Sequence, residues 1–255
     1  MASGFKYPVY IISKGRHACA LTAINFNKSG IKYLIAVDPQ EYDLYCSSLG
    51  VDKVLKLPFS NLGLGSYPAR NFCWEHAKDK GYKYHWLFDD NIQNWAKWIN
   101  GKRKKWEEIE KSLLYVEQNA DKTGVDISGF EEPNFVVKTP KKAFKYNCHV
   151  YSAMLIKNDL PYRWRLKYNE DVDLCLQVLH NGGTTSSCVY YMADKVSTAQ
   201  KMKGGNQTEL YQGNAPKKNL LKAKMLEAVW PQYTKTVIRF GRHHHLIDWK
   251  QFKRK

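Results

Sequence analysis

The chain has 255 residues, of which 44% are hydrophobic and 14% are aromatic, so it can bury a sizeable core. This composition excludes a disordered chain and suits one large domain. Forty lysines and arginines against 24 acidic residues leave a formal charge of +16. A surplus of this size attracts polyanions such as nucleic acid over long range, and solubility alone would need less charge.

Strand and helix signals alternate over the first third of the chain. Strands are expected at 7–12, 31–37, 51–57 and 82–88, with helices between them at about 17–28, 41–50 and 68–81. This spacing predicts an α/β fold with a parallel sheet and right-handed crossovers. In such sheets ligands bind beyond the carboxyl ends of the strands.

The second half is less regular. A basic segment at 97–105 precedes an amphipathic helix whose apolar face contains Trp106, Ile109, Leu113 and Val116. Further strands are expected at 125–130, 135–138, 149–156 and 189–192, and helices at 171–180 and in the Lys-rich stretch ending near Trp230. Since no linker separates two units, residues 1–255 are expected to form one domain.

The sequence carries no secretory or membrane signal. Residues 1–10 lack the apolar core of a signal peptide, and no stretch approaches the roughly 20 apolar residues of a membrane span. The six cysteines are scattered without a CxxC pair, which argues against structural zinc and disulfides. We therefore expect a cytoplasmic protein without a membrane partner.

The sharpest chemical signal is Asp89-Asp90-Asn91, at the end of the fourth expected strand. Two crowded carboxylates repel each other unless a cation neutralises them, and oxygen ligands of this kind suit Mg²⁺ or Mn²⁺. Such an ion would bridge the carboxylates to a diphosphate and assist its departure as a leaving group. A polar turn after a strand is the plain alternative, and the motif leaves open which two of the three side chains touch the ion.

Two other clusters contain groups able to accept protons or bind metal. Asn169-Glu170-Asp171 opens the helix expected at 171–180, where acidic residues also serve as ordinary helix capping. Arg242-His243-His244-His245 lies near the end of the given sequence, and neutral imidazole is a competent metal ligand. An exposed basic tail is the alternative there. In a strand, His243 and His245 would lie on the same side.

Cations and aromatic residues complete the candidate site residues. Cations suit a nucleotide diphosphate or its base, and the candidates are Lys14, Arg16 and Arg70. Ser13 and Asp38, at the ends of the first two expected strands, are further candidate contacts to the nucleotide. Basic residues near tryptophans suit a nucleic-acid backbone and a displaced base, and those considered are Lys97, Lys102, Arg103, Lys104, Lys105, Lys201 and Lys203. Any single run of this kind is more often a solvated surface, and the tryptophans have packing as an alternative role.

The order of the motifs YPVYIISKGR, YPARN, WLFDDNI, NEDVDL and a late HHH resembles the TET-associated glycosyltransferases of bacteriophages, relatives of base J glucosyltransferase, over about residues 7 to 250. The resemblance implies a GT-A type, Rossmann-like fold with a mixed, mostly parallel central sheet flanked by helices. The donor-binding half would be about 7–95 and the acceptor-binding half about 96–255.

The same resemblance implies roles for individual residues. The helix carrying Arg70 and Asn71 would contact the nucleotide of a UDP-sugar, and the Asp89–Asn91 turn would hold the metal, with His245 as the favoured late histidine. Asp171, with Glu170 as runner-up, would accept the proton of the acceptor hydroxyl. An acidic residue is usual where this chain has Asn91.

The resemblance further implies inverting transfer onto 5-hydroxymethylcytosine in DNA, in the cytoplasm of a host cell if the protein is phage-encoded. Alternatives are a nucleotidyltransferase on a similar sheet, a non-catalytic DNA-binding relative, and a transferase acting on a cell-surface polysaccharide. The choice of sugar, DNA versus RNA, and the oligomeric state are left open by the sequence.

Overall fold

The computed structural model describes residues 4–196, 202–205 and 215–252. Its helices are α1 (Leu21–Lys28), α2 (Tyr42–Leu49), α3 (Tyr67–Asp79), α4 (Ile109–Thr123), α5 (Glu170–His180) and α8 (Ala215–Val229). The main sheet contains β1 (Val9–Ile12), β2 (Leu34–Val37), β3 (Val54–Lys56), β4 (Tyr84–Asp89), β5 (Ile92–Ile99), β6 (Lys102–Lys105), β7 (Ile127–Glu131), β8 (Phe144–Tyr146), β9 (Ala153–Lys157) and β10 (Ser186–Lys195). Strands β11 (Thr234–Arg239) and β12 (Arg242–Ile247) form a separate hairpin.

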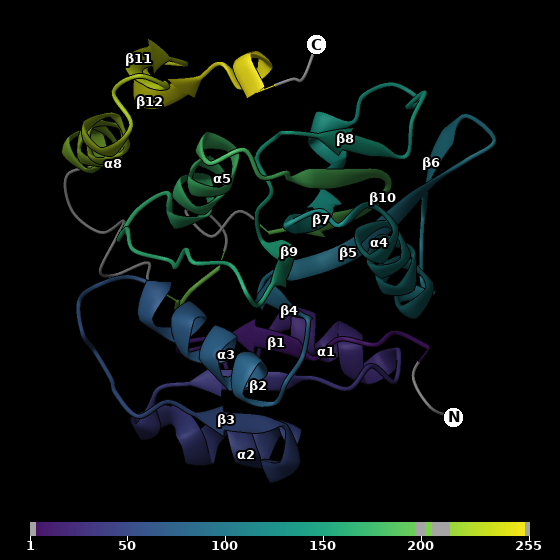
Figure 1. Ribbon diagram of the computed structural model, residues 1–255. Coiled ribbons are helices and arrows are strands. Elements are labelled where there is room, and N and C mark those ends of the chain that lie inside the picture. The colour runs from purple at the N-terminus through teal and green to yellow at the C-terminus, as the bar shows by residue number, and fades with distance from the viewer. Residues whose placement is uncertain (1–3, 197–201, 206–214, 253–255) are drawn as a thin grey trace.

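The main sheet is mixed and flanked by helices (Figure 1). Its strand order is β3-β2-β1-β4-β9-β7-β10-β5-β6, and β8 pairs with β10. Strands β1 to β4 pair in parallel, as their alternation with helices predicts. Beyond them β9 lies antiparallel between β4 and β7. This arrangement confirms the predicted α/β fold of the Rossmann-like GT-A type.

Successive side chains of the central strands enter two cores, one on each face of the sheet. On one face Ile11 and Phe88 pack with Phe26 of α1, and on the other Leu87 packs with Trp74 of α3. All five side chains are fully buried. Burial of each aliphatic or phenyl side chain contributes about 1.5–3 kcal/mol, so these cores fix the ends of β1 and β4 relative to the helices.

In the second half the basic segment has a defined structure, and one predicted strand is wrong. The basic segment is part of the hairpin β5–β6, which turns at Asn100 and Gly101, both with positive φ. The strand predicted at 135–138 is absent, because Pro133 starts a 3-10 turn ending at Phe135. Val136 beyond it is buried against Trp98 of β5 and Met192 of β10, whereas Val137 is 79% exposed, so the segment packs on the sheet through single side chains and pairs with no strand of the described residues.

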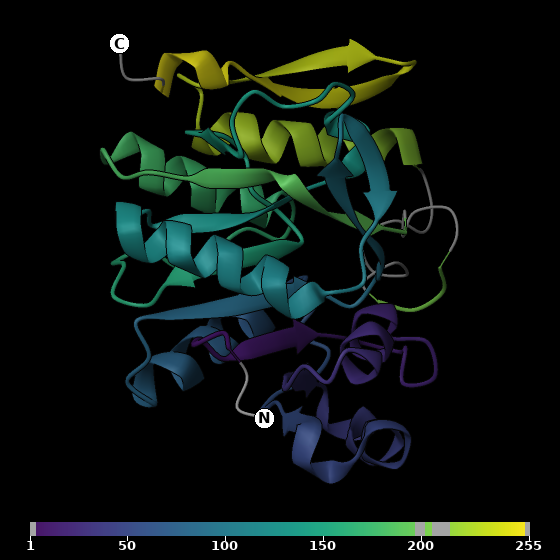
Figure 2. The ribbon, with the colours of Figure 1, turned by 90° about the vertical axis from the view of Figure 1, so that its right-hand side faces the viewer.

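Helix α8 and the β11–β12 hairpin form the layer at one end of the molecule, with the hairpin outermost (Figure 2). The apolar cluster beneath them joins Val172 and Leu176 of α5 to Leu226 and Ile247. The helices of the described residues include none that is both long and apolar enough to cross a membrane.

A fully buried histidine makes the stability of this fold pH-dependent. His85 lies in β4 with Nδ1 2.5 Å from the Asn158 side-chain oxygen, and burial lowers its pKa to about 4. The unfolded chain would bind a proton near pH 6.5, so the unfolding free energy falls as the pH drops from 6.5 towards 4. The loss should reach about 3 kcal/mol. Denaturant titrations across this range test it, and His85→Gln should flatten the dependence.

Candidate active site

A cleft of about 330 Å³ opens at the carboxyl ends of β1, β2 and β4, beside the start of α5. It brings together most of the residues that the sequence predicts for the donor, the metal and the proton acceptor. Those lining it are Ser13, Lys14, Arg16, Asp38, Arg70, Asp89, Asp90, Asn91, Glu170 and Asp171. The donor half and the acceptor half of the predicted scheme therefore both contribute to one cavity.

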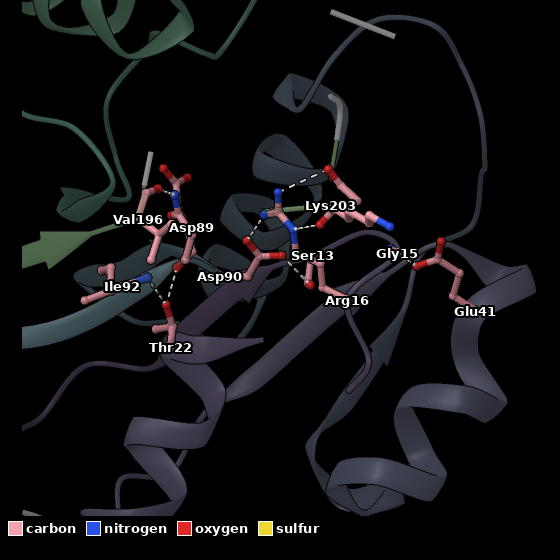
Figure 3. Close-up of polar contacts among 12 residues, drawn as sticks. Ser13, Gly15, Arg16, Thr22, Glu41, Asp89, Asp90, Ile92, Val196 and Lys203 are labelled. Carbon is pink, nitrogen blue, oxygen red and sulfur yellow. Dashed lines mark hydrogen bonds and ion pairs between the residues drawn. The ribbon is translucent and has the colours of Figure 1, made fainter. Parts of the chain in front are cut away.

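Asp90 directs its carboxylate into the protein. One oxygen pairs with the guanidinium of Arg16, and the other accepts a 2.6 Å hydrogen bond from Ser13 Oγ (Figure 3). Tyr45 lies 2.6 Å from the same hydroxyl and also accepts the backbone N–H of Arg16. Burial raises the pKa of Asp90, although Arg16 and Ser13 act in the opposite direction. With both oxygens engaged, Asp90 holds the β1 and β4 ends together.

Arg16 and Asn91 also attach the end of β10 and a later turn to the cleft. Arg16 donates to the backbone carbonyls of Lys203 (3.0 Å) and Gly204 (3.1 Å), and Asn91 Nδ2 donates to the Val196 carbonyl (2.7 Å) (Figure 3). Gly204 has φ +81°, and a side chain there would lie 2.4 Å from the Gly15 carbonyl oxygen. This turn therefore requires glycine.

Asp89 and Asn91 are the members of the turn that suit a metal ion. Asp89 Oδ1 accepts 2.7 Å from Arg70 Nη2, and Asn91 Oδ1 is buried without a hydrogen-bond partner in the described structure. A carboxylate and an amide oxygen fit Mg²⁺ or Mn²⁺, which complete their shells with phosphate and water. Across 4–196, 202–205 and 215–252, no cluster of three or more His, Cys, Asp or Glu side chains could hold a metal.

Arg70 is buried between two carboxylates. Its Nη2 binds Asp89, and its Nε lies 3.4 Å from Glu170 Oε1, while the guanidinium stacks 4.8 Å from the Trp164 ring. Glu170 also accepts a 2.6 Å hydrogen bond from Ser66. Burial raises the pKa of Glu170, with Arg70 opposing and Asp171 adding to the rise. Arg70 thus joins the strand end at Asp89 to the first turn of α5.

Asp171 is held differently from its neighbour. Oδ2 lies 3.2 Å from His149 Nε2, and Oδ1 accepts the backbone N–H of Val172. Burial alone would raise the pKa of Asp171, but the neighbouring His149 together with Lys195 and Arg70 reverses this and lowers it. Asp171 is therefore ionised at neutral pH, as a proton acceptor must be. The higher-titrating member of the pair is Glu170.

His149 itself was missed by the sequence analysis. Its ring is stacked between Tyr151, with centroids 4.7 Å apart, and Trp249, with centroids 5.9 Å apart. Burial lowers the pKa of His245, and His149 and Asp171 also act on it, so His245 lies in this neighbourhood too. His245 does not line the cleft at Asp89–Asn91, so its predicted role as a metal ligand gains no support from the geometry.

Three cations in the cleft also went unpredicted. Lys195 ends β10 and donates 2.7 Å to Ser152 Oγ, while Lys167 and Lys222 come from the segment before α5 and from α8. Burial lowers the pKa of Lys222 to about 8. No motif marks these lysines. The packing of β10, α8 and the segment before α5 around the cleft reveals them. Together they make its wall suitable for polyphosphate.

Other predicted donor contacts divide into two groups. Lys14 lines the cleft, where its ammonium lies 3.2 Å from Asp38 and 2.9 Å from Asn61 Oδ1. Asn71 lies outside the cleft and makes two hydrogen bonds to the backbone of Trp164, at 2.8 and 3.1 Å. The structure thus gives Asn71 a role in holding the chain before α5 rather than a place against the nucleotide.

The predicted nucleic-acid residues lie mainly on the β5–β6 hairpin. Lys102, Arg103, Lys104 and Lys105 are exposed along β6, an edge strand. Lys97 instead packs its ammonium over the aromatic rings of Trp106, Tyr190 and Tyr191. The side chain of Lys203 is exposed, whereas Lys201 lies outside the described residues.

The buried ion pair predicts unequal effects of the two aspartates on stability. Asp90→Asn leaves the Arg16 guanidinium buried without its counter-charge, so the unfolding free energy should fall by about 3–5 kcal/mol. Asp89→Asn should cost much less, because Glu170 still faces Arg70. Chemical denaturation of both variants measures the difference. Equal stability of the two would contradict the anchoring role of Asp90, and Asp79→Asn on the surface serves as control.

Comparison with known proteins agrees with this geometry. The profile of a family described as TET-Associated Glycosyltransferase matches residues 7–205. The match covers more than half of the chain and includes the Asp89–Asn91 turn and the start of α5. A search of the curated proteins finds no match. The chain therefore belongs to the TET-associated glycosyltransferase family and is an enzyme that transfers sugar to modified DNA.

Proposed function

We propose that this enzyme transfers a sugar from a UDP-sugar, with a divalent cation and inversion at the anomeric carbon, onto the hydroxyl of 5-hydroxymethylcytosine in DNA. The observation that carries the proposal is one cleft lined both by oxygen atoms that suit a cation and by a second carboxylate that suits a proton acceptor. Asp89 and Asn91 line the same cavity as Asp171. A donor diphosphate and an acceptor hydroxyl therefore have complementary groups within one site.

The donor would lie along the carboxyl ends of β1 and β4. Asp89 and Asn91 would hold Mg²⁺ or Mn²⁺, which when bound neutralises charge developing on the leaving diphosphate. Lys14, Lys195 and Lys222 line the cleft and favour the same anion. Arg70 keeps Asp89 and Glu170 in place, since both are within 3.4 Å of its nitrogens.

Asp171 is the residue proposed to activate the acceptor. Its carboxylate would accept the proton of the hydroxymethyl group while that oxygen forms a bond to the anomeric carbon and the bond to UDP breaks. This single displacement inverts the anomeric centre. His149, 3.2 Å from Oδ2, keeps the carboxylate ionised and oriented.

A screen of donors and acceptors tests the function. UDP-sugars are incubated with DNA containing 5-hydroxymethylcytosine and with unmodified DNA, and the digested nucleosides are analysed by mass spectrometry. The expected result is a glycosylated nucleoside from modified DNA only, with release of UDP. Release of pyrophosphate would instead indicate a nucleotidyltransferase, and equal labelling of unmodified DNA would contradict the proposed acceptor.

The metal assignment predicts loss of activity on chelation. EDTA should abolish transfer, and Mn²⁺ or Mg²⁺ in excess should restore it. Asp89→Asn should lower the rate at saturating metal and raise the metal concentration needed, because one carboxylate ligand is lost. Rates measured across a metal titration give both quantities. Full activity of the metal-free enzyme in EDTA would rule the assignment out.

If Asp171 is the base, replacing one of its carboxylate oxygens by an amide nitrogen should lower the transfer rate strongly. Asp171→Asn keeps the start of α5 but removes the proton acceptor, so the single-turnover rate should fall by roughly 10²-fold or more. Glu170→Gln should be milder. Because the pKa of Asp171 is lowered, the wild-type rate should not fall until the pH drops below the ordinary carboxylate range. Near-wild-type turnover of Asp171→Asn would exclude Asp171 as the base. So would a wild-type rate that, on acidification, has already fallen before the pH reaches 6.

A further inference from the structure

The β11–β12 hairpin lies outside the residues that match the family and has features that the fold does not need. Its strands pair from Thr234 with Ile247 at the base to Arg239 with Arg242 at the tip. The base is buried against α8 and α5, with Thr234 and Ile247 at most 9% exposed. The tip extends from this anchored base at the outer layer of the molecule (Figure 2).

The tip exposes an aromatic ring at a position that disfavours it. Phe240 and Gly241 form the two-residue turn with φ of 52° and 71°, a geometry that normally selects Asn, Asp or Gly at the first position. Phe240 is nevertheless 94% exposed, and the neighbouring Ile238 is 71% exposed. The Phe240 ring touches only the edge of His244 within the hairpin, with ring centroids 6.4 Å apart, so a strained tip with two exposed apolar side chains buries little apolar surface in the described protein and points to a partner.

The outer face of the hairpin carries positive charge. The strand alternation places Lys235, Arg239 and Arg242 on the face opposite the buried Thr234 and Ile247. None of the three forms an ion pair with a carboxylate of the described residues, although Arg242 Nε donates 3.0 Å to His244. Residues 215–252 contain eight lysines and arginines and two acidic residues. The charge complements a polyanion.

The base of the hairpin connects this surface to the proposed catalytic carboxylate. Ile247 packs with Val172 next to Asp171, and Trp249 just beyond β12 stacks on His149, which lies 3.2 Å from Asp171 Oδ2. His245 pairs with Thr236 two residues nearer the tip. At about 3.3 Å per residue, the tip lies about 16 Å along the strand from His245. A ribbon of this length spans several base pairs beside a nucleotide bound at Asp171, since each base pair adds about 3.4 Å.

We propose that the β11–β12 hairpin is a DNA-binding ribbon that grips the duplex beside the target base. A two-stranded ribbon fits a DNA groove, with Arg239 and Arg242 at phosphates and Phe240 against the bases. The identification of duplex DNA as the partner rests on the proposed function. An acidic protein would match the charge equally, but it would not need an aromatic ring at the very tip, where base faces offer stacking.

Binding of a fluorescent duplex containing one 5-hydroxymethylcytosine tests the hairpin, measured by anisotropy at several salt concentrations. Phe240→Ala should weaken binding about tenfold with an unchanged salt dependence, because stacking releases no counterions. Arg239→Gln with Arg242→Gln should reduce the slope of log affinity against log salt by about 2, since each lost phosphate contact removes about 0.9. Lys28→Gln with Lys32→Gln, the same charge change on exposed residues of the opposite end, is the control.

The outcomes separate this inference from the proposed function. Hydrolysis of UDP-sugar without acceptor should be unchanged in all hairpin variants, because none of these residues lines the cleft. Wild-type DNA affinity in both hairpin variants would overturn the ribbon while leaving the transferase intact. Heparin binding with the same dependence on Phe240 would also overturn it, because heparin offers no bases. DNA binding that depends on the hairpin in an enzyme without sugar transfer would instead refute the proposed function.

Discussion

A guanidinium that cannot lose its charge is buried at the centre of this molecule, and the active cleft is arranged around it. Arg70 is 5% exposed and must be neutralised where it lies. It takes one carboxylate from the end of β4, Asp89, and a second from the start of α5, Glu170. The strand with the proposed cation site and the helix with the proposed base are thereby fixed against each other, although they are far apart in the sequence.

The same constraint separates the roles of neighbouring acidic residues. In Asp89-Asp90-Asn91, Arg16 and Ser13 occupy Asp90, so Asp89 and the amide oxygen of Asn91 are left for a cation. At the helix, Arg70 engages Glu170, whereas Asp171 faces His149. All four acids line the cleft, but the two members of each adjacent pair are held by different partners. Charge partners, rather than the motif itself, distinguish them.

The sequence was informative where local pattern and topology coincide. The alternating elements before Asp89 fold as predicted, because β2 pairs with β1 and β3 with β2 through single helical crossovers, and β4 then pairs with the other edge of β1. The residues at the strand ends therefore meet in one cleft as expected. The later strands pair out of order, with β9 inserted between β4 and β7, and no local periodicity encodes that choice.

Long-range packing also explains the site residues that were missed. Lys222 reaches the cleft from α8, and His149, which lies beside Asp171, stacks on Trp249 from a distant part of the sequence. Of the two adjacent acids at the start of α5, burial raises the pKa of Glu170, whereas the proximity of His149 lowers the pKa of Asp171. Asn71 shows the converse case. Its place beside Arg70 predicted a nucleotide contact, but the helix turns it towards the Trp164 backbone.

The central claim is that donor and acceptor functions lie on opposite sides of Arg70 within one cleft. Calorimetric titration of UDP in the presence of Mn²⁺ tests it without depending on turnover. The account predicts that Asp89→Asn weakens UDP binding strongly and raises the Mn²⁺ concentration that this binding needs, while Asp171→Asn binds UDP like the wild type. Equal loss of UDP affinity in both variants, or Mn²⁺-dependent binding that survives Asp89→Asn unchanged, would contradict this division.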